Sequence, residues 1–427
     1  MTTARGRSGD RPVSPKLRVL MVSDVSPSLP EGGGERMLWE QAWRLAARGH
    51  DVRIVSRAHT DGGEASATIR EGVRLRPFGV DRRTSVSFAV SAMLAARRAV
   101  NRELRDQPAE VLHVHQPLAG YGAFRAPAAR RLPSLYSFYS PAPLEFRARR
   151  GMTAHHRGGW RGRFGFVALR AIERACLRHA TLIHVLSDFS AGQLWRLYRI
   201  PPERIVKIPG AVAADRFVPA ADREAVRRTL GLPTDRPLLF TVRNLEARMG
   251  LDQLIRALAV LTRDARAPLL LIGGAGSLRG ELESLRDALG LGEHVRFLGF
   301  VSDEALPLYY QAADLFILPT RELEGFGLVT VEALACGTPV LGTPVGATPE
   351  ILVPLEPSLV FRGLAPEVMA EDIRRFLERQ ARDPEAHARL RQACRRHAET
   401  HYDWAGAIGA LEGALARLAG GARRGPE

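Results

Sequence analysis

The sequence predicts two doubly wound α/β domains in tandem, facing each other across a cleft. A chain of 427 residues is longer than a domain with a single hydrophobic core usually is, so two domains are expected. The apolar content of 45% is typical of a globular protein. Strand-like apolar runs alternate with helical patterns in two successive rounds, and this alternation is typical of parallel sheets.

The first round begins with the apolar run "LRVLMVSD" at 17–24. A glycine-containing loop follows, then a helical pattern over 36–49 and a strand over 50–57, which together form a βαβ unit. Further strands are expected at 109–117, 132–140 and 181–187, and a helix at 164–180.

The second round predicts five strands, three helices before residue 315 and a further helix that begins near Gly327 or Leu328, and the chain closes with one more helix. The strands are expected at 237–242, 268–274, 294–300, 315–320 and 338–343, the helices at 251–263, 277–290 and 305–313. We expect a disordered tail over 1–16, a Rossmann-like domain over 17–205, a second over 206–402, and a helix over 403–420 that crosses back to the first.

The composition restricts the partners and the compartment. The formal net charge is +15, and because lysine occurs only at Lys16 and Lys207, part of this charge reflects an Arg-rich composition. The remainder favours anionic partners such as phosphates, nucleic acid or an acidic membrane surface. Three widely separated cysteines form no disulfide or zinc pattern, and no signal peptide or membrane span is apparent, so we expect a cytoplasmic protein.

One segment carries most of the chemical information, "LEGFGLVTVEALACG" at 323–337. It follows the strand expected at 315–320, and a helix is expected to begin near Gly327 or Leu328. Glycines in such a loop let the backbone approach a ligand closely. The free amides of the helix start then favour an anion.

Two carboxylates flank these amides, Glu324 before them and Glu332 about one turn into the helix. Carboxylates accept paired hydrogen bonds from vicinal hydroxyls. An extended ligand with a central diphosphate and a sugar at each end, such as a nucleotide-sugar, fits this order. The alternative is that Glu324 is a solvated loop acid and Glu332 a charge that favours the helix start; the segment alone supports both equally.

The longer segment "EGFGLVTVEALACGTPVLGTPVGATPEIL" resembles the E-x7-E segment of the family-four retaining glycosyltransferases, which have the two-domain GT-B fold. Supporting matches occur in the right order over nearly the whole chain. They are "PEGGGERMLWEQAWRLAARGHDV", "VLSDFS", "IPGAVAADRFVP", "VRNLEARMGLDQLIRAL", "LIGGAGSLRGELE" and "VRFLGFVSDEALPLYYQAADLFILPT".

The resemblance implies a role for each matching residue. Glu324 would bind hydroxyls of the donor sugar near the reacting carbon, Glu332 the nucleotide ribose, and Arg243 the leaving diphosphate. Backbone groups would complete the donor site: Gly32, Gly33, Gly274, Gly276, Gly325, Phe326, Gly327, Leu328 and Val329, with Phe300 and Val301 beside the base.

The resemblance also implies the reaction. A nucleotide-diphosphate sugar would donate its sugar to a hydroxyl acceptor with retention, and arginines and amides would stabilise the leaving diphosphate. The sequence contains no Asp-x-Asp pair, so we expect neither a metal nor a cofactor. The family's usual pattern fails at three places: Met249 replaces a lysine, Tyr139 replaces an active-site histidine, and Ala211 and Ala213 replace glycine and aspartate. Arg248 is the candidate replacement for the missing lysine.

The acceptor side is less defined. His113 and His115 alternate along a strand end, where they either line the acceptor pocket or form a satisfied, half-buried pair; Glu145 is a further candidate. Segment 147–178 interleaves arginines with aromatics and is either a membrane-surface patch at the inner face of the cell membrane or a solvated basic face.

Two other functions are alternatives to glycosyl transfer. A GT-B scaffold with weakened catalysis could act as a membrane- or anion-binding module; retention of both glutamates argues against it. A pyridoxal-phosphate phosphorylase needs a Schiff-base lysine in the second domain, and Lys207, at the domain border, does not fit that role. We expect no nucleic-acid partner.

Overall fold

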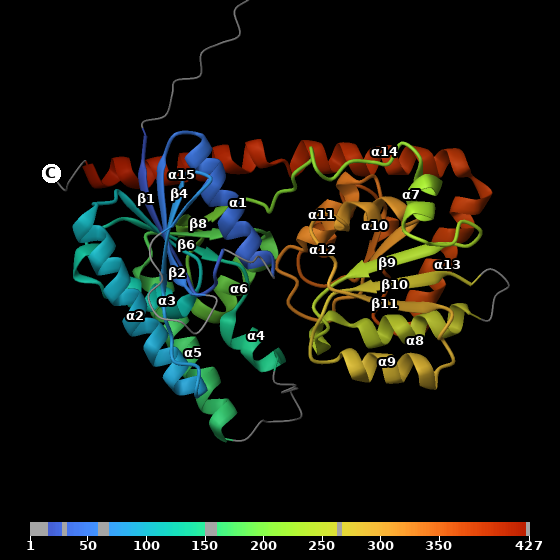
Figure 1. Ribbon diagram of the computed structural model, residues 1–427, viewed down its shortest axis with the longest axis horizontal. Helices are drawn as coiled ribbons and strands as arrows, with labels where there is room; N and C mark the ends of the chain where they lie inside the picture. The colour runs from blue at the N-terminus through green and yellow to red at the C-terminus, as the bar shows by residue number, and fades with distance from the viewer. Residues whose placement is uncertain (1–15, 28–31, 59–67, 150–159, 263–266, 424–427) are drawn as a thin grey trace, which may run out of the picture. The chain divides into compact units, whose positions relative to one another are not determined.

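The computed structural model describes residues 16–27, 32–58, 68–149, 160–262 and 267–423, and it contains two β-sheets (Figure 1). Grouped by contacts, the chain forms two compact units. Unit 1 comprises Met1–Ser137, Ala175–Ile183 and Ile408–Glu427; unit 2 comprises Phe138–Arg174 and His184–Ala407. This grouping places much of 138–205 with unit 2, whereas the sequence predicts a domain boundary at 206.

The first sheet has eight strands in the order β3-β4-β2-β1-β5-β6-β7-β8. They are β1 (Arg18–Ser23), β2 (Asp51–Arg57), β3 (Thr68–Arg70), β4 (Val73–Phe78), β5 (Val111–Val114), β6 (Ser134–Phe138), β7 (Leu182–Val185) and β8 (Ile205–Lys207). β1 pairs in parallel with β2 and β5, and β3 pairs antiparallel with β4. Because β1 is apolar on both faces, five of its six residues are buried.

The helices before β9 are mostly the crossovers of the first sheet. They are α1 (Gly33–Ala47), α2 (Ser85–Asp106), α3 (Pro117–Phe124), α4 (Ala142–Arg149), α5 (Trp160–His179), α6 (Asp188–Tyr198) and α7 (Arg223–Thr229), with short 3-10 turns at Pro127–Ala129 and Pro202–Arg204. Thr84 and Ser87 form a capping box that fixes the start of α2.

The second sheet has five parallel strands in the order β11-β10-β9-β12-β13. They are β9 (Leu238–Val242), β10 (Leu269–Gly273), β11 (Val295–Gly299), β12 (Leu315–Leu318) and β13 (Val340–Gly342). The chain builds outward from β9 in one direction and then returns to build outward from β12 in the other. β9 and β12 therefore meet where the strand order reverses, the place at which doubly wound sheets bind ligands.

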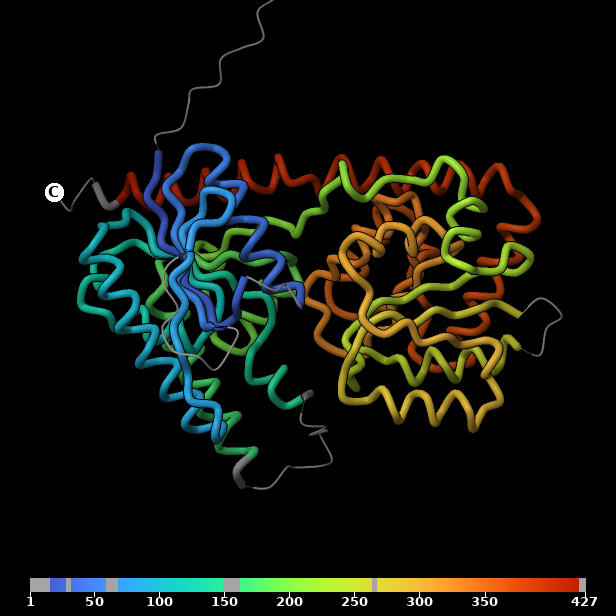
Figure 2. Tube along the Cα trace, viewed as in Figure 1, coloured from blue at the N-terminus to red at the C-terminus, as the bar shows by residue number. Residues whose placement is uncertain are grey.

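Helices cover both faces of this sheet. They are α8 (Leu251–Leu261), α9 (Arg279–Ala288), α10 (Leu306–Ala312), α11 (Leu328–Ala335), α12 (Thr348–Leu352), α13 (Pro366–Arg382) and α14 (Pro384–His401), with 3-10 turns at Ala247–Met249 and Pro357–Leu359. The last helix, α15 (Trp404–Arg423), belongs to unit 1 from Ile408 onward. Figure 1 shows α8 and α9 on one side of the sheet and α10 and α11 on the other, and Figure 2 traces the chain between them.

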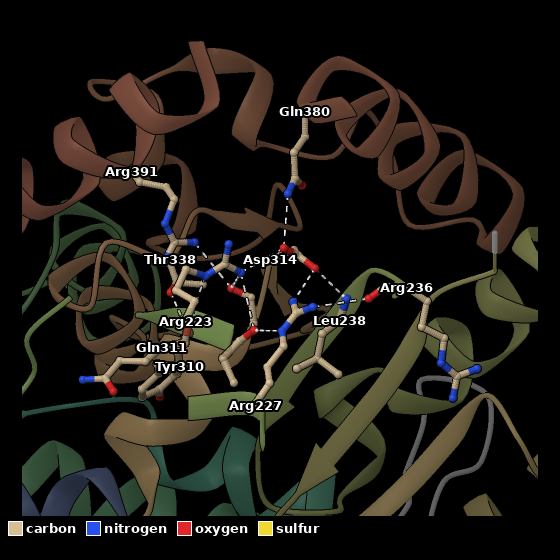
Figure 3. A network of polar contacts seen from close by, with 12 residues as sticks. Arg223, Arg227, Arg236, Leu238, Tyr310, Gln311, Asp314, Thr338, Gln380 and Arg391 are labelled. Atoms are coloured by element: carbon tan, nitrogen blue, oxygen red, sulfur yellow. Dashed lines mark hydrogen bonds and ion pairs between the residues drawn. The ribbon is translucent and has the colours of Figure 1, made fainter. Parts of the chain in front are cut away.

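A buried ion cluster around Asp314 fixes β12 beside β9 (Figure 3). The Asp314 carboxylate accepts hydrogen bonds from Arg223 (2.8 Å), Arg227 (2.7 Å) and the backbone N–H of Leu238 (2.8 Å), the first residue of β9. Burial alone would raise the pKa of Asp314, but the two arginines lower it to about 2. The strands that carry the candidate site are thus held in register at their amino ends.

The strands and helices that the sequence predicted are present, with ends shifted by a few residues. The helix expected near Gly327 or Leu328 begins at Leu328, and the final helix runs over Trp404–Arg423. In unit 1, Glu412 of that helix pairs with Arg48 at 2.9 Å and lies 3.2 Å from His50. Short or weakly patterned elements, such as β3, β8 and α7, were not predicted.

Candidate functional site

The site in unit 2 is built where β9 and β12 end. Arg243 directly follows β9, and the loop that follows β12 carries Glu324. Because the two strands are parallel neighbours, their carboxyl ends bring together residues that are 81 positions apart in the sequence. The switch point of the sheet is therefore also the point where a cation and an anion meet.

Arg243 and Glu324 form a buried ion pair. The Arg243 Nη2 donates to Glu324 Oε2 at 2.6 Å, and Thr320 Oγ1 donates to the same oxygen at 2.8 Å. Burial alone would raise the pKa of Glu324, but the pair with Arg243 and the Thr320 hydrogen bond outweigh it and lower that pKa. Glu324 is therefore an ionised hydrogen-bond acceptor near neutral pH and is poorly suited to hold a proton.

The start of α11 presents unpaired amides. Gly327 caps the helix with φ +86°, a left-handed conformation that a side chain would strain. Among the described residues, the N–H groups of Phe326, Gly327, Leu328 and Val329 have no acceptor within the protein. Four free donors at a helix start suit an anion such as a phosphate.

Glu332 lies one turn into α11 and is buried, with 3% of its surface exposed. Tyr310, on α10, donates its hydroxyl to Glu332 Oε2 at 3.0 Å. Tyr310 is itself packed among Phe217, Phe240 and Phe316, so its hydroxyl has little freedom. This contact fixes one oxygen of the carboxylate that the sequence analysis assigned to the ribose.

The other predicted donor-side residues of unit 2 lie next to the end of β9. Gly274 and Gly276 pass close to the backbone of Arg243–Leu245. A Cβ on Gly274 would stand 1.9 Å from the Arg243 carbonyl oxygen, and one on Gly276 would stand 2.5 Å from the Leu245 carbonyl oxygen. Phe300 is 75% exposed, and Val301 packs beside Gly273. The turn between Gly274 and Gly276 thus packs directly against the backbone of the segment that carries Arg243.

Tyr139 reaches the same loop through its backbone. A Cβ on Gly325 would meet the Tyr139 carbonyl oxygen at 2.3 Å, so Gly325 is needed for this contact within the protein. Ser187 Oγ donates to the Gly325 carbonyl at 2.7 Å. The loop that carries Glu324 is therefore fixed by residues before β8 as well as by its own strand.

The second cation of the site is displaced from the family's usual position. Met249, which replaces the usual lysine, is buried, and its sulfur lies 3.0 Å from Arg243 Nη2. Arg248 donates to the carbonyl of Leu323 at 3.2 Å and lies 4.0 Å from Glu145 Oε1. Leu323 has φ +60°, so Arg248 holds a strained residue directly before Glu324.

Glu145 is the acceptor-side candidate that the structure brings to this loop. It lies on α4 and accepts a hydrogen bond from Ser140 Oγ at 2.5 Å, besides its contact with Arg248. Glu145 thus stands next to the residue that supports the strained Leu323.

Four predicted residues belong to unit 1. Gly32 caps α1 in an extended conformation and Gly33 is its first residue. His113 and His115 are buried, with ring centroids 4.1 Å apart, and His113 Nε2 lies 2.8 Å from Ser137 Oγ. Within their unit these histidines are buried, deeper than the half-buried pair that was one of the two alternatives.

The basic segment is partly described. On α5, Arg163, Arg170, Arg174 and Arg178 are exposed, as are Phe164 (66%) and Val167 (64%). Arg150 and Arg157 of the predicted patch lie outside the described residues, as do the side chains of Arg149, Trp160 and Arg161. Within the described part of the chain, no helix is long and apolar enough to cross a membrane.

Sequence reasoning missed the residues that support the site rather than form it. Thr320, Tyr310 and Ser187 each bond a predicted residue or its neighbour. Thr320 lies two residues after β12 and four positions before Glu324, a spacing that could have suggested a contact. Nothing in the sequence around Tyr310 or Ser187 distinguishes them from core or capping residues.

Comparison with known proteins identifies the family. Residues 31–216 match the family described as Glycosyltransferase Family 4, and residues 222–397 match Glycosyl transferases group 1. A D-inositol 3-phosphate glycosyltransferase of Actinosynnema mirum is 30% identical over 341 residues, 76% of this chain and 78% of that protein. The Mycolicibacterium smegmatis protein of the same description is 29% identical over 92% of this chain and 88% of its own length.

Solved structures share the fold. The chain superposes on a sucrose-phosphate synthase from Thermosynechococcus elongatus with a TM-score of 0.80, at 23% identity, covering 95% of this chain and 100% of that one. It superposes on Anabaena HepE, solved with UDP and glucose, with a TM-score of 0.72, at 18% identity, covering 94% of this chain and 100% of that one. These likenesses confirm the predicted two-domain GT-B fold class.

The fold and the site thus define a glycosyltransferase of the GT-B class. More particularly, the chain belongs to the family-four glycosyltransferases, the group-1 family that its sequence resembles.

Proposed function

We propose that this glycosyltransferase takes its sugar from a nucleotide-diphosphate sugar, transfers it with retention to a hydroxyl acceptor and needs no metal. The observation that carries the proposal is the free amide cluster of α11 between Glu324 and Glu332. This order suits a diphosphate at the amides, the donor sugar at Glu324 and the ribose at Glu332.

The proposed mechanism rests on charge stabilisation. As the bond between the sugar and the diphosphate breaks, negative charge grows on the departing phosphate, and Arg243 together with the α11 amides would stabilise it. Before the donor binds, Arg243 is neutralised by Glu324. A donor sugar whose hydroxyls bond Glu324 would therefore free the guanidinium for the phosphate.

A nucleotide-diphosphate sugar is also supported by the relatives. HepE was solved with UDP and with UDP-glucose, and the sequence relatives are described as acting on D-inositol 3-phosphate. UDP, UDP-sugars and D-inositol 3-phosphate are therefore the first ligands to test. Bacterial glycan, glycolipid or secondary-metabolite synthesis is the proposed setting.

A thermal-shift screen of nucleotides and nucleotide-sugars tests the donor proposal. We expect at least one to raise the melting temperature of the wild type and to raise that of Glu332→Ala much less. A wild type that no nucleotide stabilises would contradict the proposal and favour a GT-B scaffold that acts as a binding module. Transfer assays with EDTA, and NMR of the product's anomeric configuration, test metal independence and retention.

We also propose that α5 makes a peripheral contact with an anionic membrane. Exposed Phe164 and Val167 stand among exposed arginines, a combination that suits a lipid headgroup region. Flotation with anionic liposomes should weaken in an Arg163→Ser/Phe164→Ser variant and persist in Arg256→Ser, an exposed arginine on α8. Equal flotation of the two variants would rule this surface out.

A further inference from the structure

A charged pocket lies at the outer edge of the sheet in unit 2. Its volume is about 360 Å³, within the range of small-molecule sites. It is open to solvent and is lined by the edge strand β11, by α9 and by the loops that precede β9 and β11. The charged or aromatic residues that line it are Arg236, Arg279, Glu283, Arg286, Glu293, Arg296 and Phe297.

The lining carries an uncompensated positive charge. Arg279 pairs with Glu283 at 2.9 Å, and Arg286 pairs at 2.7 Å with Asp287, which does not line the pocket. Arg236 and Arg296 make no ion pair with any residue that the structure describes, although Arg236 donates to the Glu293 carbonyl at 2.9 Å. The lining of the pocket thus holds four guanidinium groups and only two carboxylates.

We propose that this pocket binds a phosphorylated small molecule. Guanidinium groups bind phosphate oxygens through paired hydrogen bonds, and four arginines line this pocket. Arg286 lies over the ring of Phe297, 5.8 Å from its centroid, and this contact restricts the orientation of the guanidinium. The volume admits a ligand of the size of a sugar phosphate.

This pocket lies away from the predicted diphosphate position, although its lining residue Arg279 lies beside Gly299, the residue before Phe300. Arg236 precedes β9, whereas Arg243 follows the opposite end of the same five-residue strand, which spans about 13 Å. None of Arg243, Glu324 and Glu332 lines the pocket. Binding here is therefore an activity distinct from recognition of the donor diphosphate.

Hydrogen–deuterium exchange of the full chain with inorganic pyrophosphate tests the proposal, because it reports where the anion binds. We expect slower exchange in peptides covering 279–299, and loss of this protection in Arg286→Ser/Arg296→Ser. Arg256→Ser should retain the protection, because Arg256 is exposed on α8 outside the pocket. Should the double variant fail to fold, the single change at exposed Arg296 serves the same comparison.

Glu332→Ala separates the pocket from the donor site. Protection of 279–299 should survive in this variant even where nucleotide binding is lost. An unprotected wild type, protection that survives in the pocket variants, or protection that disappears in Glu332→Ala would each overturn the proposal. Failure of the donor proposal alone would leave the pocket's protection unchanged.

Discussion

Arg243 and Glu324 neutralise one another inside unit 2, with 2.6 Å between guanidinium nitrogen and carboxylate oxygen. Both side chains are largely buried, at 6% and 9% exposure. The residues assigned to the leaving phosphate and to the donor sugar are therefore coupled before any donor arrives, and their contributions to stability and to catalysis can be separated.

Removing one member of this pair should destabilise the protein. Glu324→Ala leaves Arg243 buried without its partner, which typically costs about 3–5 kcal/mol. Arg243→Met/Glu324→Leu should recover most of the loss, because it removes both charges, yet show no transfer activity. Urea denaturation measures the free energy of unfolding of each variant. Glu224→Ala is the control, because the Arg228–Glu224 pair is exposed. Equal free energies of unfolding for the two Glu→Ala variants would show that the buried pair is energetically unimportant.

Tyr310→Phe should weaken donor binding without disturbing the fold. The change removes only the hydroxyl that bonds Glu332 at 3.0 Å. One such hydrogen bond contributes about 1 kcal/mol, so the KM for the donor should rise about fivefold while kcat changes less. Tyr309→Phe is the matched control, since Tyr309 stacks on Phe240 and its hydroxyl has no partner among the described residues. Identical KM values for the two variants would remove Tyr310 from the site.

Gly325→Ala should distort the donor loop. The new Cβ would stand 2.3 Å from the Tyr139 carbonyl oxygen, so one of the two backbones must move. We expect a loss of about 1–3 kcal/mol in unfolding free energy and a loss of nucleotide binding. Gly192→Ala, in α6, meets nothing within 4 Å and should be neutral or stabilising. A Gly325→Ala protein with wild-type stability and binding would contradict this account of the loop.

Stability should fall as the pH rises through the titration of Glu173. This residue is buried on α5, where Tyr198 donates to its carboxyl group and the Ala142 N–H donates at 3.2 Å. Burial raises its pKa from 4.5 to about 8, despite the lowering effect of these hydrogen bonds. A raised carboxyl pKa stabilises the fold most below about 4.5, and this contribution is lost as the pH rises to about 8.

Glu173→Gln should remove this dependence and make the variant more stable than the wild type above pH 8. Denaturation at several pH values between 5 and 8.5 measures how the free energy of unfolding depends on pH. Glu203→Gln is the control, because Glu203 is exposed. Parallel pH profiles for wild type and Glu173→Gln would show that Glu173 does not titrate in this range.

Tyr139→His should raise donor turnover, because it restores the side chain that the family commonly carries at this position. Tyr139 already lies beside the Glu324 loop through its carbonyl group. Steady-state assays with the donor that stabilises the wild type measure the effect. Unchanged turnover would place the Tyr139 side chain outside the reaction.

The sequence by itself determined the fold class and the helix start between the two glutamates of unit 2, while the donor-binding roles of its residues stay predictions. Alternating apolar runs identified the parallel strands, and a glycine loop between two glutamates identified the helix start at Leu328, because these signals are local. Only the tertiary structure decided the partners: Glu324 with Arg243 and Thr320, Glu332 with Tyr310, and Gly325 with Tyr139. These residues meet because parallel strands align their carboxyl ends, and sequence spacing does not encode that proximity.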